Sequence, residues 1–262
     1  MFQDILEKII IFKKKEVAKK KKTLPLFRLK VRLDETQYPR DFKTSISCGD
    51  RVRIIAEIKR RSPSAGILRD NLNPAQFARL YEQNGASAIS VLIDEKFFGG
   101  NLKDLQMAKG AVSLPVLAKE FIVDEYQIYE AKLYGADAIL LIARMLSQEK
   151  LLKFYQTACS IQMGCIVEVH SPEDVKKILH LPFPLLVGIN NRDLKNFEVN
   201  LSITERILSL LPPSSVVISE SGIKTAEDIK LLRAKGVHIF LVGEAILRSS
   251  NPGEKLRELC YG

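Results

Sequence analysis

The sequence predicts an α/β fold, a single (β/α)8 barrel of the TIM type, from three observations. From residue 52 onward, apolar β-branched runs alternate with amphipathic stretches, which is a βα rhythm. Eight such units follow one another, which favours a closed barrel over an open doubly wound sheet. The runs are continuously hydrophobic, as parallel strands buried on both faces are. We therefore expect a catalytic barrel over residues 51–262, preceded by a helical extension over residues 1–50 that packs on it.

The strand candidates recur along the whole of the predicted barrel. They are VRIIAEIKR (52–60), SAISVLID (87–94), PVLAKEF (115–121), DAILLIA (137–143), GCIVEVH (164–170), LLVGINN (185–191), VVISESG (216–222) and VHIFLVGEA (237–245). No GxGxxG motif follows the first of them, which argues against a dinucleotide-binding Rossmann half.

The helix candidates between the strands begin at capping residues. In NPAQFARLYEQNG, Asn73 is the expected N-cap, Pro74 the first helical residue and Gly85 the stop. SPEDVKKIL and TAEDIKLLRAKG open with Ser171 and Thr225, each followed by acidic residues in the first turn. The sequence therefore predicts where these connecting helices begin.

The extension carries most of the positive charge. The chain has a net charge of +9, and residues 1–40 hold twelve Lys and Arg against five Asp and Glu. Apolar residues at helical spacing predict a first helix over residues 1–21, followed by an irregular stretch over residues 23–43. We interpret the run FKKKEVAKKKK (12–22) as the solvated face of that helix. The alternative, a nucleic-acid patch, lacks interleaved aromatic residues, and we do not expect nucleic-acid binding.

Composition indicates an ordinary globular protein. Of the 262 residues, 46% are hydrophobic and 27% charged, and no apolar run approaches the roughly 20 residues of a membrane span. The N-terminus lacks a secretory signal pattern and the four cysteines are scattered, so we expect a cytoplasmic protein. The three histidines form no HxxxH or HxH spacing, so we expect no metal site.

Polar residues end six of the predicted strands. They are Glu57 and Lys59; Lys119; Glu168; Asn190 and Arg192; Glu220, Ser221 and Gly222; and Gly243 and Glu244. Any one of these residues could simply mark the point where a strand reaches solvent. Burying so many charges together without a function, however, would cost several kcal/mol per unpaired charge. Because the carboxyl ends of barrel strands form the active site, we expect a mutually neutralising cluster around an anionic substrate. The glycines of SESGI and LVGEAI add a phosphate site, where backbone N–H groups approach closely.

Seven stretches in order resemble the indole-3-glycerol-phosphate synthase family over nearly the whole chain. They are IAEIKRRSPSAG, SVLIDEKFFGG, PVLAKEFIVDEYQIYEAKLYGADAILLIARML, VEVHSPED, GINNRDLKNFEV, SESGI and FLVGEAIL. The resemblance implies a barrel with an N-terminal helical segment. It also implies cofactor-free conversion of 1-(2-carboxyphenylamino)-1-deoxyribulose 5-phosphate to indole-3-glycerol phosphate, carbon dioxide and water in tryptophan biosynthesis.

The resemblance also assigns roles to residues. It implies that Lys119 is the general acid, that Glu168 is the second acid or base, and that Glu57 and Lys59 organise the site. Substrate-contacting positions would be Asn190, Arg192, Glu220 and Ser221, the apolar walls Phe98 and Phe121, and the phosphate cradle Lys59, Ser62, Gly222, Gly243 and the backbone of Glu244. The implied partners are the phosphorylated substrate and, as candidates, other enzymes of the pathway, with the chain a monomer or weak homodimer.

Two residues depart from the family pattern. Glu120 follows Lys119 where the family usually has Asp, and Ile93 stands where it usually has Thr. If the strand alternates, Glu120 points away from the Lys119 face and affects only the surroundings of the site. We further expect neighbouring cations such as Lys59 to lower the pKa of Lys119, and Glu57 to balance both lysines before substrate binds.

Two other functions fit less well. Phosphoribosylanthranilate isomerase, a sister barrel, would need a Cys/Asp pair where this chain has Glu57 with Lys59 and Glu168. A catalytically silent barrel that binds nucleic acid through its basic N-terminus is opposed by the presence of Lys119 and Glu168.

Overall fold

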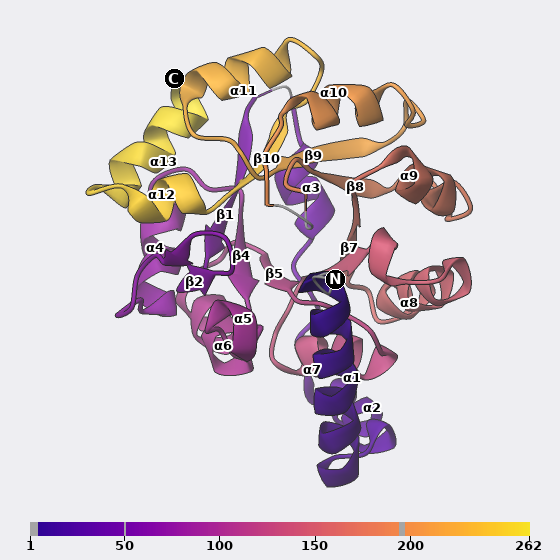
Figure 1. Ribbon diagram of the computed structural model, residues 1–262. Helices are drawn as coiled ribbons and strands as arrows, with labels where there is room; N and C mark the ends of the chain where they lie inside the picture. Colours follow the sequence, from indigo (N-terminus) through magenta and orange to yellow (C-terminus); the bar gives the residue numbers. More distant parts are fainter. Residues whose placement is uncertain (1–4, 50, 194–196) are drawn as a thin grey trace.

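The computed structural model describes residues 5–49, 51–193 and 197–262. In this part of the chain, eight parallel strands close into a barrel in the order β1-β10-β9-β8-β7-β6-β5-β4 (Figure 1). Their bounds are β1 Arg53–Ile58, β4 Ala88–Leu92, β5 Val116–Lys119, β6 Ala138–Ile142, β7 Gly164–Val169, β8 Leu186–Asn190, β9 Val216–Glu220 and β10 Ile239–Val242. Each lies within one predicted strand, so the sequence prediction of a (β/α)8 barrel is confirmed.

Two layers of apolar side chains explain why the strands are continuously hydrophobic. Ile55, Leu117 and Ile166 point inward and form a cluster inside the barrel. Their neighbours along the strands, such as Ile54 and Val167, join the larger cluster between the barrel and its helices. Alternation along each strand therefore places Glu57, Lys119 and Glu168 on the inward face, one pleat beyond the inner core.

Helices surround the barrel on its outer side. They are α4 Pro74–Gln83, α5 Glu95–Phe98, α6 Leu102–Ala111, α7 Glu125–Leu133, α8 Gln148–Ser160, α9 Pro172–Ile178, α10 Ser202–Leu208, α11 Ala226–Arg233, α12 Glu244–Arg248 and α13 Pro252–Tyr261, with a 3₁₀ turn η2 at Ala143–Met145. The three predicted N-caps, Asn73, Ser171 and Thr225, each accept a hydrogen bond from a backbone N–H in the first turn. The capping prediction is thus confirmed.

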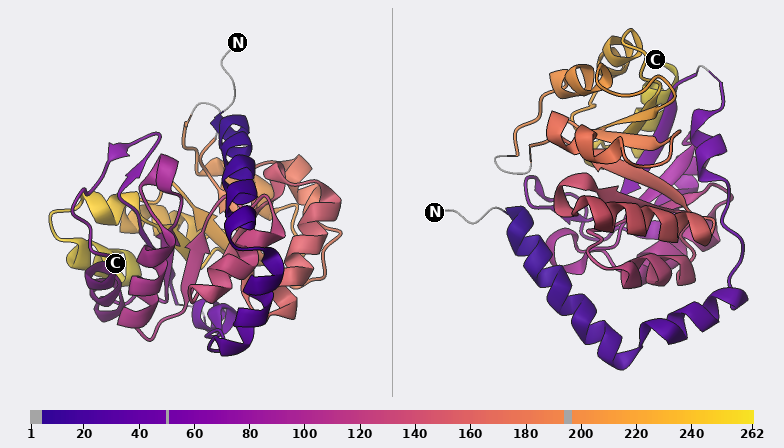
Figure 2. Two further views of the ribbon diagram at one scale, coloured as in Figure 1. Left: turned by 90° about the horizontal axis from the view of Figure 1, so that it is seen from below. Right: turned by 90° about the vertical axis from the view of Figure 1, so that its right-hand side faces the viewer.

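The extension runs along one side of the barrel from end to end, as the right-hand view of Figure 2 shows. It comprises α1 Ile5–Thr23, α2 Leu26–Arg32, the 3₁₀ turn η1 Leu33–Glu35 and α3 Phe42–Ser47. The first four residues of the predicted helix lie outside the described residues. The prediction of an irregular stretch over residues 23–43 is wrong, because α2 packs Leu29 against Tyr126 and Tyr129 of α7. Phe42 and Ile46 of α3 join the cluster inside the barrel.

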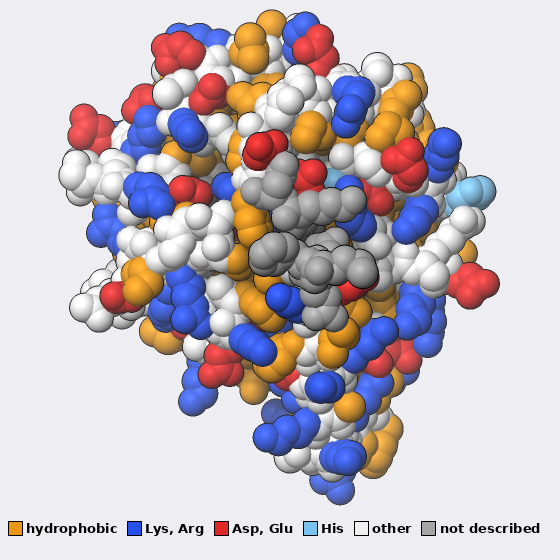
Figure 3. Space-filling model, in the orientation of Figure 1, with side chains coloured by type: hydrophobic (Ala, Val, Ile, Leu, Met, Phe, Trp, Pro, Cys, Tyr) orange, Lys and Arg blue, Asp and Glu red, His pale blue; other side chains and the backbone are white. Residues whose placement is uncertain are grey.

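The basic run on α1 is only partly solvated. Figure 3 shows Lys and Arg side chains gathered at the end of the molecule that α1 and α2 form. Lys13, however, is 1% exposed, and Lys20 and Lys21 pair with Glu130 and Asp124 of the barrel. The interpretation of the run as a solvated face is therefore wrong for Lys13, because carboxylates of the barrel lie beneath it.

A short antiparallel hairpin that the sequence analysis did not predict lies between β1 and α4. It consists of β2 Arg61–Ser62 and β3 Gly66–Ile67 and continues the chain directly from Lys59. Within the described residues, no helix is long and apolar enough to cross a membrane. The four cysteines are free.

Candidate active site

A cavity of about 720 Å³ opens at the carboxyl ends of the barrel strands. Every residue that the sequence analysis assigned to the site lines it: Glu57, Lys59, Ser62, Phe98, Lys119, Phe121, Glu168, Asn190, Arg192, Glu220, Ser221, Gly222, Gly243 and Glu244. The barrel thus brings together residues spread over most of its strands. Their placement is what the parallel strands of a closed barrel produce, because all carboxyl ends meet at one face.

The floor of the cavity is a cluster of buried charges. The ammonium group of Lys119 contacts the carboxylate of Glu220 and lies 3.6 Å from Oε2 of Glu168. Lys59 forms an ion pair with Glu57, two residues earlier on the same face. The expectation that Glu57 balances both lysines is therefore only partly right, since Glu220 is the direct partner of Lys119.

The pKa of Lys119 is raised, not lowered as the sequence analysis expected. Burial lowers it, but the nearby carboxylates of Glu220, Glu168 and Glu57 more than offset that effect. Lys59 does not act as the expected perturbing cation because its own ammonium is occupied by Glu57. Lys119 is therefore an ammonium ion throughout the physiological pH range.

Three carboxylates and two ammonium groups leave the cluster one negative charge in excess. Burial, together with the neighbouring charges of Glu168 and Glu57, raises the pKa of Glu220 to about 7, although Lys119 opposes the shift. The pKa of Glu57 is lowered: burial raises it, and the charges of Lys59 and Lys119 outweigh burial. The two shifts have opposite directions, so the protonated form is favoured at Glu220 and the charged form at Glu57.

Two glycines make room for these carboxylates. A Cβ on Gly188 in β8 would collide with the carboxylate of Glu220 on the neighbouring strand. A Cβ on Gly243, just after β10, would lie 2.6 Å from Oε1 of Glu57. Gly243 was predicted only as part of the phosphate cradle, whereas in the structure it also borders the charge cluster.

Glu168 has two polar neighbours besides Lys119. Asn190 donates a hydrogen bond of 3.3 Å to its Oε1, and Nε2 of His170 lies 3.2 Å from the same oxygen. Burial lowers the pKa of His170 to about 4, with the Arg144 charge adding to the effect, so the imidazole is neutral. His170 ends the predicted strand 164–170, but its contact with Glu168 was not predicted. Its VEVH spacing, two residues apart on one strand, was the signal for this contact.

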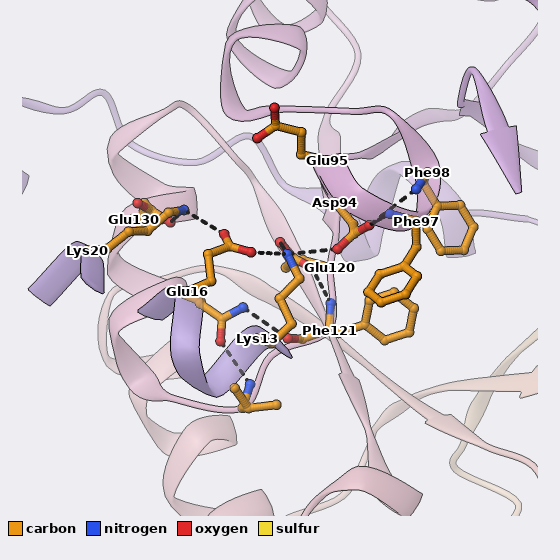
Figure 4. A network of polar contacts seen from close by, with 12 residues as sticks. Lys13, Glu16, Lys20, Asp94, Glu95, Phe97, Phe98, Glu120, Phe121 and Glu130 are labelled. Atoms are coloured by element: carbon orange, nitrogen blue, oxygen red, sulfur yellow. Dashed lines mark hydrogen bonds and ion pairs between the residues drawn. The ribbon is translucent and has the colours of Figure 1, made fainter. Parts of the chain in front are cut away.

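One side of the cavity is apolar. The rings of Phe98 and Phe121 lie with centroids 5.9 Å apart, and both appear as neighbours in Figure 4. Ile5 and Ile9 of α1 also line the cavity. Both lie within the first helix that the sequence predicts, but their place in the site was not predicted, because nothing local shows which part of the barrel a helix will contact.

The opposite side carries cations and tight turns. Arg192 and Arg248 both lie against Glu244, at 3.4 and 3.1 Å, and both line the cavity. Ser221 and Gly222 adopt positive φ angles of 63° and 87° where the chain turns after β9. Glycine adopts such angles freely, but for Ser221 the conformation is strained, and strain of this kind clusters at functional sites. Arg248 was missed by the sequence analysis, since it lies on α12 beyond the strand ends.

A closed (β/α)8 barrel with buried acid and base groups, an aromatic wall and a cationic rim defines an enzyme of acid–base chemistry on an aromatic, anionic small molecule. Within the described residues, no group of three or more His, Cys, Asp or Glu side chains could hold a metal ion.

Comparison with known proteins narrows this class to one family. The family model for indole-3-glycerol phosphate synthase matches residues 6–259. The indole-3-glycerol phosphate synthase of Alkaliphilus metalliredigens (strain QYMF) is 42% identical over 258 residues, covering 98% of each chain. That of Legionella pneumophila (strain Paris) is 43% identical over 258 residues, covering 97% of this chain and 98% of the relative. The chain belongs to the indole-3-glycerol phosphate synthase family.

The fold is also shared with a more distant protein. The crystal structure of 3-hexulose-6-phosphate synthase from Salmonella typhimurium matches with a TM-score of 0.60 at 11% identity, covering 79% of this chain and 96% of that one. At this identity the likeness concerns the barrel fold alone.

Proposed function

We propose that the chain converts 1-(2-carboxyphenylamino)-1-deoxyribulose 5-phosphate to indole-3-glycerol phosphate, carbon dioxide and water. One observation supports this proposal beyond family membership. The Lys119 ammonium lies between the carboxylates of Glu168 and Glu220, and this group of charges is flanked by an aromatic wall on one side and a cationic rim on the other. The substrate has the same order of parts, with an aromatic ring at one end, a ketone in the middle and a phosphate at the other end.

Ring closure is assigned to Lys119. The ring carbon that bears the carboxylate forms a bond to the ketone carbon, and the carbonyl electron pair moves to oxygen, which takes a proton from the ammonium. The raised pKa of Lys119 keeps that proton available. It does not prevent the transfer, because an alkoxide is a far stronger base than an amine. Loss of carbon dioxide then returns the bonding electrons to the ring and restores its aromaticity.

Dehydration is assigned to Glu168. The hydroxyl group formed by ring closure leaves with a proton as water, and the adjacent CH2 carbon loses a proton to complete the indole. Asn190 holds one oxygen of Glu168 by a hydrogen bond, which fixes the direction of the other, and the neutral ring of His170 packs beside the same oxygen. Glu57 and Lys59 form the ion pair that organises the floor of the cavity, and Glu220 keeps Lys119 in place.

The phosphate is assigned to the cationic rim. Arg192 and Arg248 present guanidinium groups, which suit the geometry of phosphate oxygens. The backbone at Ser62, Gly222, Gly243 and Glu244 completes the cradle, and Lys59 supplies a further positive charge for the phosphate or the substrate carboxylate. Asn190 and Ser221 contact the middle of the substrate, and Phe98 and Phe121 flank its ring.

The test is incubation of the purified protein with the substrate, with indole fluorescence and released carbon dioxide measured together. We expect equal amounts of both products, and equal rates with and without a chelator. Release of carbon dioxide without indole, or activity that a divalent metal restores after chelation, would contradict the assignment.

We include in the same proposal the domain organisation, the cellular location and the oligomeric state of the chain. They are the division at residue 50 into a packed helical extension and a catalytic barrel, the cytoplasmic location, and a monomeric or weakly dimeric state with contact to other enzymes of tryptophan biosynthesis. Sedimentation of the purified chain over a range of concentrations tests the oligomeric state, and constant mass would support the monomer.

A further inference from the structure

One buried ammonium group joins the extension to the barrel. Nζ of Lys13 lies 2.9 Å from Oδ2 of Asp94, 2.9 Å from Oε2 of Glu120 and 3.1 Å from Oε2 of Glu16 (Figure 4). Lys13 is 1% exposed and Asp94 is fully buried, whereas Glu16 lies at the solvent edge. Asp94 follows β4 and Glu120 follows β5, so Lys13 ties α1 to the carboxyl ends of two adjacent strands.

Both barrel carboxylates also hold the backbone of the aromatic wall. Oδ1 of Asp94 accepts hydrogen bonds from the N–H groups of Phe97 and Phe98, at 2.6 and 3.2 Å, and so begins α5. Oε1 of Glu120 accepts one of 2.7 Å from the N–H of Phe121. A single carboxylate therefore connects the Lys13 ammonium to the backbone of each wall residue, Phe98 and Phe121. Neither of these carboxylates belongs to the Lys119 cluster.

The helix that carries Lys13 also closes the cavity. Ile5 and Ile9 line it, and Lys13 follows Ile9 by four residues, so the three lie along one face of α1. Without the ammonium, Asp94 and Glu120 would be two neighbouring buried carboxylates with like charge. One of them would take up a proton or turn away, and the backbone it holds would shift.

We propose that Lys13 is a positioning residue for the reaction: by neutralising Asp94 and Glu120 it fixes Phe98 and Phe121, and it seats α1 so that Ile5 and Ile9 cover the aromatic end of the substrate. This inference rests on the proposed function, because it assumes that the aromatic ring lies at this wall. Lys13 acts through the two carboxylates and touches no reacting atom.

The experiment compares Lys13→Met with Lys20→Met. Lys20 lies on the same helix and also pairs with two carboxylates, Glu16 and Glu130, but neither holds the cavity wall. We expect Lys13→Met to raise KM about 10–100-fold, the range expected when binding groups are misplaced by about 1 Å, with a smaller change in kcat. Lys20→Met should keep the wild-type KM.

A rescue variant separates positioning from folding. Glu120→Gln keeps an oxygen that can accept the hydrogen bond from the N–H of Phe121, and it removes one buried charge. In the double variant Lys13→Met with Glu120→Gln, KM should therefore return most of the way to the wild-type value. Binding is followed independently of turnover by fluorescence titration with anthranilate for the aromatic end and by competition with inorganic phosphate for the other. We expect Lys13→Met to weaken anthranilate and leave phosphate unchanged.

These readouts distinguish the two levels of inference. If the wild type binds anthranilate and phosphate but forms no indole product, the proposed function fails. If the wild type is active and folded Lys13→Met has the wild-type KM and anthranilate affinity, the positioning role of Lys13 is overturned. The positioning role would also be overturned if the raised KM of Lys13→Met stayed as high after Glu120→Gln was added, since the charge balance would then not be the cause.

Discussion

Gly243 lies directly against Glu57: a Cβ on residue 243 would be 2.6 Å from Oε1 of Glu57 and 2.9 Å from its Cβ. A methyl group there must push Glu57 away from Lys59, its ion-pair partner. This relationship links the turn after β10 to the charge cluster. The glycine is therefore required by the side chain of Glu57, in addition to the phosphate approach that we propose for this turn.

Gly243→Ala should lower kcat as well as raise KM. Displacement of Glu57 disturbs the floor of the cavity, and misplacement of such groups by about 1 Å costs about 10²-fold in rate. Steady-state kinetics and inhibition by inorganic phosphate measure the two effects. Gly110→Ala on α6 is the control, because a Cβ there meets nothing within 4 Å. If Gly243→Ala weakened phosphate binding and left kcat unchanged, Gly243 would serve the phosphate cradle alone and its contact with Glu57 would not affect catalysis.

Lys119→Met should lower kcat by about 10²–10⁴-fold, the usual contribution of general acid catalysis, while substrate binding falls less. Methionine keeps the apolar stem and removes the proton donor. Glu168→Gln should also slow turnover, but after ring closure, so an intermediate should accumulate with it and not with Lys119→Met. Single-turnover kinetics with carbon dioxide and indole followed separately test this. If Lys119→Met released carbon dioxide at the wild-type rate, Lys119 would act in the dehydration step and not in ring closure.

The sequence predicted the barrel and the residues that line the cavity well, because both depend on local patterns. Strand alternation and the shared direction of parallel strands suffice to place Glu57, Lys119 and Glu168 at one face. It failed on the electrostatics, because the sign of the Lys119 pKa shift depends on Glu220, 101 residues away on the far side of the barrel. The burial of Lys13 was missed for the same reason: its partners lie on other elements.

His170→Asn should make the protein less sensitive to acid. The pKa of His170 is lowered from 6.5 to about 4, so the folded chain binds this proton less tightly than the unfolded chain. The stability that the neutral imidazole contributes is complete above pH 6.5 and is lost as the pH falls toward 4. Over that range the wild type should lose about 3 kcal/mol relative to His170→Asn. Urea unfolding at several pH values measures it.

The control for that series is His180→Asn, because His180 is exposed. It should unfold in parallel with the wild type at every pH. Equal acid sensitivity of the wild type and His170→Asn would mean that His170 takes up its proton as readily in the folded chain as in the unfolded one.

Lys13→Met should be destabilised more at high pH than at low pH. Burial already raises the pKa of Glu120 to about 7, opposed by the Lys13 charge. The charge of Asp94 after β4 and the N–H of Phe121 also act on Glu120, and Glu16 on α1 shares the Lys13 ammonium. Removing the ammonium raises this pKa further, because the neighbouring Asp94 charge is then unopposed.

The direction of the pH effect follows from where the proton is held. A carboxyl group with a raised folded-state pKa contributes stability that is complete below its ordinary value of 4.5 and is lost as the pH rises through the folded value. The deficit of Lys13→Met should therefore be small at pH 5 and reach about 3–5 kcal/mol at pH 8, the cost of leaving a buried charge unpaired. Denaturant unfolding at both pH values checks this. Adding Glu120→Gln should flatten the difference, and a deficit of equal size at both pH values would show that Lys13 stabilises by packing and not by charge.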